Sequence, residues 1–144
     1  MCLSRVTSIE REECEGEGWK VVYAYSHAFS YLYYTNSPNE ESFDQYNLWI
    51  SCEKRNPIKI YNSDWGSYNE YPSGFHVLLS ETDAQQYLKY LKYMILSGPR
   101  RAFLKVVKVK YKNIVAKGNQ DELPCIVVEQ IYVEQPTETE QSAN

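Results

Sequence analysis

The clearest periodic pattern in the chain begins at Ser80. Apolar residues follow at the spacing that places side chains on one face of a helix, at Ala84, Tyr87, Leu88, Leu91 and Ile95. Ser80 is a strong N-cap candidate, and Asp83 lies in the first turn, where an acid is favourable. Gly98 and Pro99 are typical of a helix end. The sequence therefore predicts one main helix over about residues 80–97.

The remaining segments show patterns typical of β-strands. Runs rich in β-branched and aromatic residues are WKVVYAY, FSYLYYTN, YNLWISC, IKIY, FHVLL, VVKVKYKN, IVA and CIVVEQIYV. After Val106, Lys108, Lys110 and Lys112 alternate with apolar residues, so these lysines are expected on an outer sheet face. Turns or loops are expected between the runs, at Gly16–Gly18, over residues 62–74 and over residues 117–124.

These elements together predict an α+β fold, in which a mostly antiparallel twisted sheet carries the helix of residues 80–97 packed on it. A length of 144 residues and an apolar fraction of 43% suit one domain with a core. We expect this domain to span residues 1–134. The last segment, residues 135–144, is polar and acidic and is expected to be disordered.

Composition argues against several classes of protein. No apolar run approaches the roughly 18 residues that a membrane span needs. The N-terminal residues lack the apolar stretch of a secretory signal, so the expected location is the cytoplasm. The four cysteines form no CxxC pair, and only His27 and His76 could join them, so no metal site is predicted. No phosphate-binding loop or dinucleotide motif is present, and no cofactor is expected.

Charge is unevenly distributed along the chain. Residues 84–120 hold nine Lys and Arg and no Asp or Glu, whereas residues 1–83 and 121–144 are both acidic. A block of this kind can create a positive field and attract an anion. The alternative is that the lysines lie on solvated outer faces and are neutralised by the acidic blocks folded beside them. The pattern leaves both interpretations open.

Aromatic and basic side chains around this block form the predicted ligand-binding site. Its residues are Trp65, Tyr68, Tyr71, His76, Arg100, Arg101, Lys105 and Lys108. Flat rings can stack on a base, and guanidinium groups match phosphate oxygens in a bidentate way. The alternatives are rings packed over the edge of the sheet and arginines that are paired with acids or solvated. The acidic flanks and a net charge of −4 argue against a general nucleic-acid binder.

His76 is the residue of this set whose ordinary pKa lies near neutral pH. A working base needs an orienting group and a nucleophile or metal nearby, and no Asp or Glu follows His76 closely on the same strand face. We therefore favour a structural histidine that holds the turn at Gly74, and no catalytic residue is assigned.

Three short motifs carry a resemblance. The segments GWKVV, GFHV followed by SETDA, and VVKVKYKNIVAKG resemble small uncharacterised proteins that bacteriophages encode. The matching positions are Gly74, Phe75, His76, Ala84, Val109, Val115, Ala116 and Gly118. The resemblance covers about half of the chain and implies a Gly-aromatic-His strand that leads into a helix and then a hairpin. It implies no established activity, but it points to a phage or mobile element as the origin, and hence to the host cytoplasm.

The function that we favour from the sequence is non-catalytic. We expect a phage-type accessory protein that binds and inhibits or sequesters a host component, as in counter-defence, with a host protein or a small anionic nucleotide as the ligand. One alternative is an enzyme that acts on a nucleotide or phosphoester through His76, Arg100 and Arg101. Another is a phage structural protein. A homodimer through exposed tyrosines on edge strands also stays open.

Overall fold

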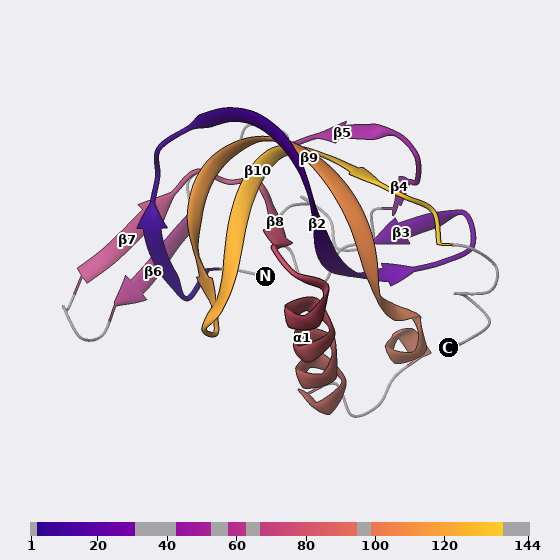
Figure 1. Cartoon of the computed structure of the whole chain (residues 1–144). Coiled ribbons are helices and arrows are strands. Elements are labelled where there is room, and N and C mark those ends of the chain that lie inside the picture. Colours follow the sequence, from indigo (N-terminus) through magenta and orange to yellow (C-terminus); the bar gives the residue numbers. More distant parts are fainter. Residues whose placement is uncertain (1–2, 31–42, 53–57, 63–66, 95–98, 137–144) are drawn as a thin grey trace.

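The computed structural model describes residues 3–30, 43–52, 58–62, 67–94 and 99–136 (Figure 1). The strands are β1 (Arg5–Ser8), β2 (Glu12–Ala24), β3 (Ala28–Ser30), β4 (Phe43–Gln45), β5 (Trp49–Ser51), β6 (Ile58–Asn62), β7 (Ser67–Tyr71), β8 (Phe75–Leu78), β9 (Leu104–Gln120) and β10 (Leu123–Val133). The helices are α1 (Glu81–Met94) and the short 3-10 helix η1 (Pro99–Phe103). All strand pairs within these residues are antiparallel, and α1 is their one α-helix, so the predicted α+β class is confirmed.

Helix α1 begins where the sequence predicts. The hydroxyl of Ser80 accepts a hydrogen bond from the backbone N–H of Asp83 at 3.1 Å, and the Ser80 carbonyl accepts one from Ala84. Ser80 is therefore the N-cap. The buried side chains Ala84, Tyr87 and Leu91 belong to the predicted apolar stripe. The described part of the helix ends at Met94, and the predicted end at Gly98 lies outside the described residues.

The hairpin of β9 and β10 differs from the prediction. The sequence indicated two short strands and a long turn over residues 117–124, but β9 is one strand of 17 residues. The turn is only Asp121 and Glu122, both with positive φ, at 47° and 72°. Two such residues match the twist of the flanking strands in a tight hairpin. A shift in register near Val128 and a positive φ at Asn113 let the long strand bend without breaking.

Strand β2 also differs from the prediction, because it passes through the expected turn at Gly16–Gly18. Both glycines allow close packing in a continuous strand. A Cβ atom at Gly16 would lie 2.5 Å from the hydroxyl of Tyr111, and one at Gly18 would lie 2.8 Å from the Leu78 carbonyl oxygen. The glycines therefore serve close approach of neighbouring strands instead of chain reversal.

The strand pairings close on themselves. Strand β9 pairs with β2 and β10, β10 pairs with β8, and β8 returns to β2 through Leu78 and Trp19. Figure 1 shows β2, β9 and β10 arching over β8 and α1. Strands β1, β5, β3 and β4 extend this sheet, whereas β6 and β7 form a separate two-stranded sheet. Part of the loop predicted over residues 62–74 is therefore strand β7, because β7 pairs with β6.

The core lies on both faces of the sheet, and β8 separates its two clusters. On one face, Leu78 packs with side chains of α1 and with Leu3. On the other face, Phe75 and Val77 pack with Phe29 and further residues of β9 and β10. All four side chains of β8 are buried, three of them apolar and the fourth that of His76.

Candidate functional site

The predicted ligand-binding residues do not form one surface. Tyr71 and His76 are completely buried, at 1% and 0% exposed. Lys108 lies on the outer face of β9, and Arg101 lies on η1. Trp65 is outside the described residues, as are the side chains of Tyr68 and Arg100, and Lys105 is half-buried at the start of β9. Within the described residues the structure brings together only Tyr71 and His76.

Tyr71 and His76 form a hydrogen-bonded pair in the core. The hydroxyl of Tyr71 lies 2.9 Å from Nε2 of His76 and accepts a hydrogen bond from the backbone N–H of Leu3, also at 2.9 Å. Burial, together with the positive charge of Lys20, holds the pKa of His76 well below its usual value. The ring is therefore neutral, and its hydrogen bond with Tyr71 ties the N-terminal segment to β8. This arrangement supports the structural histidine favoured from the sequence and leaves the ring without access to a substrate.

Lys20 is a buried charged residue that sequence reasoning missed. Its ammonium group donates a 2.9 Å hydrogen bond to the backbone carbonyl of His76, and the residue is 3% exposed. Burial lowers the pKa of Lys20 to about 8, against a smaller opposite effect of Cys125. The backbones of β2 and β8 pair at Trp19 and Leu78, and the Lys20 side chain supplies the donor for the next β8 carbonyl on that side, that of His76. The signal was present, because Lys20 shares strand parity with Val22 and Ala24, both buried.

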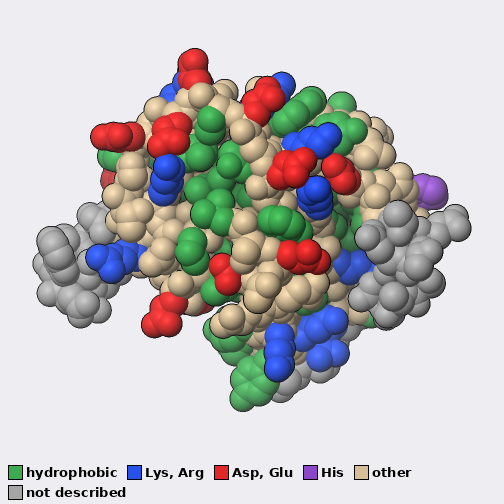
Figure 2. Space-filling model, viewed as in Figure 1, with side chains coloured by type: hydrophobic (Ala, Val, Ile, Leu, Met, Phe, Trp, Pro, Cys, Tyr) green, Lys and Arg blue, Asp and Glu red, His purple; other side chains and the backbone are tan. Residues whose placement is uncertain are grey.

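Four of the five lysines of β9 already have acidic partners. Each of four ammonium groups lies within 4 Å of a carboxylate, in the pairs Lys108–Glu17, Lys110–Glu134, Lys112–Glu15 and Lys117–Glu12. The acids come from β2 and, for Glu134, from the segment just after β10, and both lie in acidic blocks of the sequence. Figure 2 shows red and blue side chains side by side over the sheet. Here the structure agrees with the alternative interpretation, in which acidic blocks neutralise the lysines.

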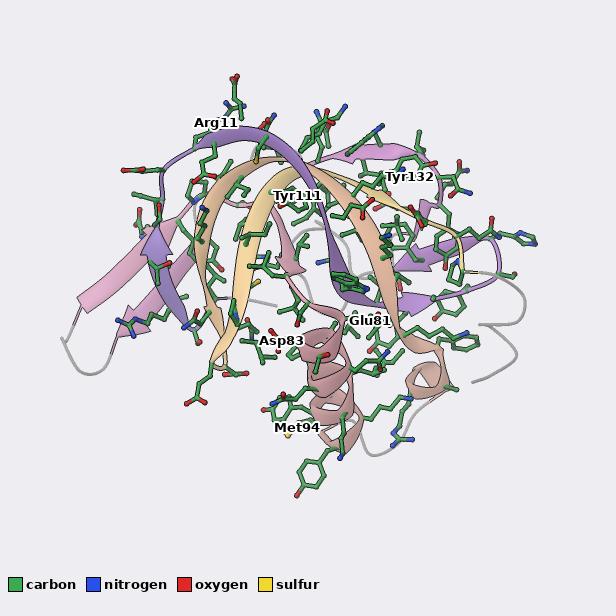
Figure 3. The ribbon with its side chains drawn as sticks, in the orientation of Figure 1. Arg11, Glu81, Asp83, Met94, Tyr111 and Tyr132 are labelled. Atoms are coloured by element: carbon green, nitrogen blue, oxygen red, sulfur yellow. The ribbon has the colours of Figure 1, made fainter. Side chains whose placement is uncertain are left out.

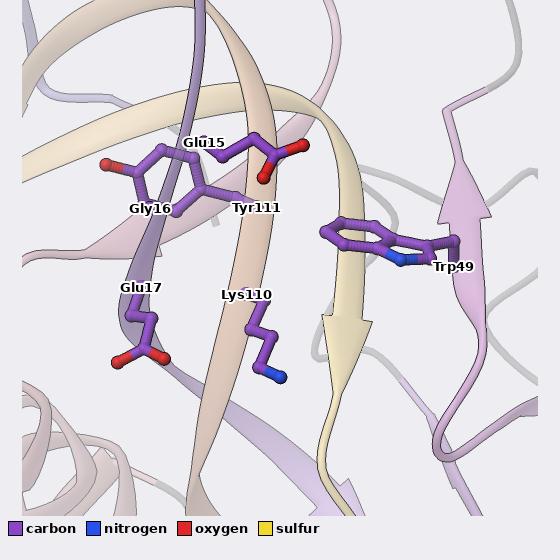
Figure 4. Close-up of a pocket in the computed structure, with 6 residues that line it drawn as sticks. All are labelled: Glu15, Gly16, Glu17, Trp49, Lys110 and Tyr111. Atoms are coloured by element: carbon purple, nitrogen blue, oxygen red, sulfur yellow. The ribbon is translucent and has the colours of Figure 1, made fainter.

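A shallow hollow lies on this ion-paired face. It has a volume of about 240 Å³ and is lined by Glu15, Gly16, Glu17, Trp49, Lys110 and Tyr111 (Figure 4). The ring of Trp49 is covered by the ammonium group of Lys112, at 4.2 Å from its centroid. Since Glu15, Glu17 and Lys110 are all in ion pairs, the charged groups of the hollow are engaged within the protein itself.

The outer face of α1 is different, and we call it the α1 patch. It consists of Lys89, Tyr90, Lys92, Tyr93, Met94 and, from η1, Arg101. Tyr93 is 73% exposed, Met94 57% and Tyr90 49%. Within the described part of the chain, the three cations of the patch form no ion pair. Arg101 donates a long hydrogen bond of 3.3 Å to the carbonyl of Lys92, which links η1 to the last turn of α1.

The α1 patch lies at the Met94 end of the helix, away from the sheet. Figure 3 shows Met94 there, with Glu81 and Asp83 at the opposite end, near the sheet. In Figure 2, hydrophobic and basic side chains gather at this lower end, with no acidic side chain among them. Sequence reasoning did not single out Tyr90, Tyr93 and Met94. Their spacing off the apolar stripe was the available signal.

Comparison with known proteins adds no relative. No protein-family model matches the chain, and neither a curated protein nor a solved structure matches it. Among the described residues, no helix has the length and apolar character needed to cross a membrane. Nor do those residues contain a group of three or more His, Cys, Asp or Glu side chains that could hold a metal ion.

Proposed function

We propose that this protein is a non-catalytic binding protein that holds an acidic protein partner on the α1 patch. The observation that carries the proposal is the contrast in pairing. Lys108, Lys110, Lys112 and Lys117 of β9 are matched by carboxylates, whereas Lys89, Lys92 and Arg101 meet no acid within the described residues. Exposed tyrosines, methionine and arginine are enriched in surfaces that recognise another protein, and Tyr90, Tyr93, Met94 and Arg101 supply them here.

A protein partner accounts for the surface better than a small nucleotide does. A nucleotide site requires a ring for the base and cations for the phosphates on one concave surface. Here Tyr71 and His76 are buried and Lys108 is paired with Glu17, so the residues expected to form that site are separated. The α1 patch is instead a convex helix end, which suits a large partner surface.

The same reasoning disfavours the enzyme alternative. His76 is fully buried and neutral, and it lies on β8, whereas Arg101 lies on η1. In keeping with the resemblance to phage-encoded proteins, the partner in this proposal is a host protein. The binding protein would inhibit that protein by covering an acidic surface that it needs for another contact.

The test is capture from bacterial lysate with purified, immobilised protein. We expect capture of acidic proteins that is lost in 0.5 M salt, because Debye screening then shortens to roughly 4 Å. The variant Lys89→Glu with Lys92→Glu should lose at least about tenfold of this capture, which corresponds to roughly 1.4 kcal/mol.

The matched control is Lys110→Glu with Lys112→Glu, which makes the same change in net charge on β9. It should keep most of the capture, with circular dichroism showing that both variants are folded. If both pairs lose capture equally, only net charge matters, and the assignment of the α1 patch is wrong.

A further inference from the structure

We infer that the partner of the α1 patch presents an acidic segment that also carries apolar side chains, so that rings and cations are engaged together. This inference rests on the proposed function and specifies its partner. Polyanions without apolar groups, such as nucleic acid or a purely acidic peptide, would then be poor ligands.

The apolar residues of the patch form one ridge. Residues of a helix are rotated by about 100° from one another, so positions three and four apart share a face. Tyr90, Tyr93 and Met94 have this spacing, and all three are exposed. Tyr90 also stacks on the buried ring of Tyr87, with centroids 6.4 Å apart. The base of the ridge is therefore supported by the core, while its outer edge is open.

The cations of the helix lie on one side of this ridge. By the same rotation, Lys89 and Lys92 fall next to each other on the flank away from Tyr90 and Met94. Arg101 lies near this flank, because it donates a hydrogen bond to the backbone carbonyl of Lys92. Tyr93 lies between the two groups. A complementary surface therefore has apolar side chains for the ridge and carboxylates along one flank, which also sets the orientation of the partner.

Charge alone would bind weakly at this position. Lys89 and Arg101 are exposed and Lys92 is half-buried, and ion pairs at such positions are screened by salt and contribute little. The three cations also lie near the C-terminal end of α1, where the helix dipole carries partial negative charge and opposes a compact anion. The exposed rings supply the missing contribution, because burying Tyr side chains removes apolar surface from water.

Synthetic polymers test the inference without knowledge of the natural partner. The probes are fluorescently labelled poly-L-glutamate, a random glutamate–tyrosine copolymer of similar length, and a duplex DNA of similar charge. Binding to the full chain is measured by fluorescence anisotropy at physiological salt. We expect the copolymer to bind at least about tenfold more tightly than poly-L-glutamate or DNA.

Variants separate the two contributions. In Tyr90→Ala with Tyr93→Ala, the copolymer should bind no more than about twofold more tightly than poly-L-glutamate. The weak binding of poly-L-glutamate itself should be unchanged. Lys89→Gln with Lys92→Gln should weaken both polymers. Trp49→Ala is the control, because Trp49 is an exposed aromatic residue of β5 far along the chain from the patch, and it should leave the preference intact.

Each other result is decisive. Equal binding of the two acidic polymers overturns the inference but leaves an acidic partner in place. Tighter binding of DNA overturns the inference and the proposed function together. Absence of copolymer binding also overturns the inference, and the lysate capture then decides the proposed function separately. Retention of the preference in the double tyrosine variant would show that the ridge is not the contact.

Discussion

Two groups of positive side chains come from one acid-free stretch of sequence and end in opposite environments. On β9, Lys108, Lys110, Lys112 and Lys117 each lie against a carboxylate of β2 or of the segment after β10. On α1 and η1, the exposed Lys89 and Arg101 and the half-buried Lys92 have no acid partner in the described residues, and they lie beside exposed rings. The first group belongs to the fold, and the second remains available to a partner.

The difference follows from the geometry of the two elements. A strand in an antiparallel pair places its side chains opposite or diagonal to those of its neighbour. Glu15 of β2 therefore meets Lys112 directly opposite on β9, and Glu17, which is opposite Lys110, meets Lys108 on the diagonal. A helix packed by one stripe has no such neighbour on its outer side. Segregation of charge in a sequence therefore does not indicate a binding surface until the pairing of elements is known.

The largest effect is expected for a lysine that belongs to neither group. Lys20→Met should stabilise the protein at pH 7 by about 2 kcal/mol. Removing the desolvation that lowers its pKa to about 8 gains roughly 3 kcal/mol, and the lost hydrogen bond to His76 costs about 1 kcal/mol. Urea denaturation measures the difference.

The same substitution should alter the pH dependence of stability. The pKa of Lys20 is lower in the folded than in the unfolded state, so the unfolded state holds more protons between pH 8 and 10.5. The free energy of unfolding of the natural protein should therefore rise over this range, and the rise should be smaller in Lys20→Met. If the pH dependence of the free energy of unfolding is the same in Lys20→Met and the natural protein, burial of a charged Lys20 ammonium group is falsified.

The next largest effect concerns the helix that presents the patch. Ser80→Ala should destabilise the protein by about 1 kcal/mol, because the hydrogen bond from the N–H of Asp83 is lost. Ser80→Asp retains an acceptor at the N-cap and should stay close to the natural protein. Thermal denaturation followed by circular dichroism compares the two. If both lose stability equally, the cap does not hold α1.

A smaller loss of stability is expected when the β9 lysines are made to resemble the unpaired cations of the α1 patch. Glu15→Gln with Glu17→Gln frees Lys112 and Lys108 and should cost roughly 0.6 kcal/mol in total, as expected for exposed ion pairs. The freed lysines should also increase the binding of poly-L-glutamate. Glu10→Gln with Glu122→Gln makes the same change in charge at exposed acids that have no ion pair within the described residues. If this control increases binding as much, local pairing is irrelevant.

The smallest effect is expected on the patch itself. Lys89→Gln with Lys92→Gln should change the free energy of unfolding by less than about 0.5 kcal/mol, because neither lysine has an acid partner to lose in the described residues. Denaturation at low and high salt measures this. A loss as large as that of the Glu15 and Glu17 variant would mean that the patch is paired after all, and the contrast between the two regions would disappear.

Local features of the structure were predictable from the sequence alone. The start of α1 at Ser80, its apolar stripe and the outward-facing Lys108 and Lys110 follow from spacing and capping, which depend on neighbours a few residues away. The strand character of β8, β10 and much of β2 follows in the same way. The α+β class needed only these local patterns.

Other features depended on contacts between distant segments. Gly16 and Gly18 lie within a strand because β2 pairs with β9 through both of them, and β9 is continuous because β2 and β10 pair along it. Burial of Lys20 and His76, and the neutralisation of the β9 lysines, likewise arise where segments far apart in the chain meet. A sequence determines which side chains alternate on each element, but only tertiary packing decides which of them face water, because that depends on the partner each face finds.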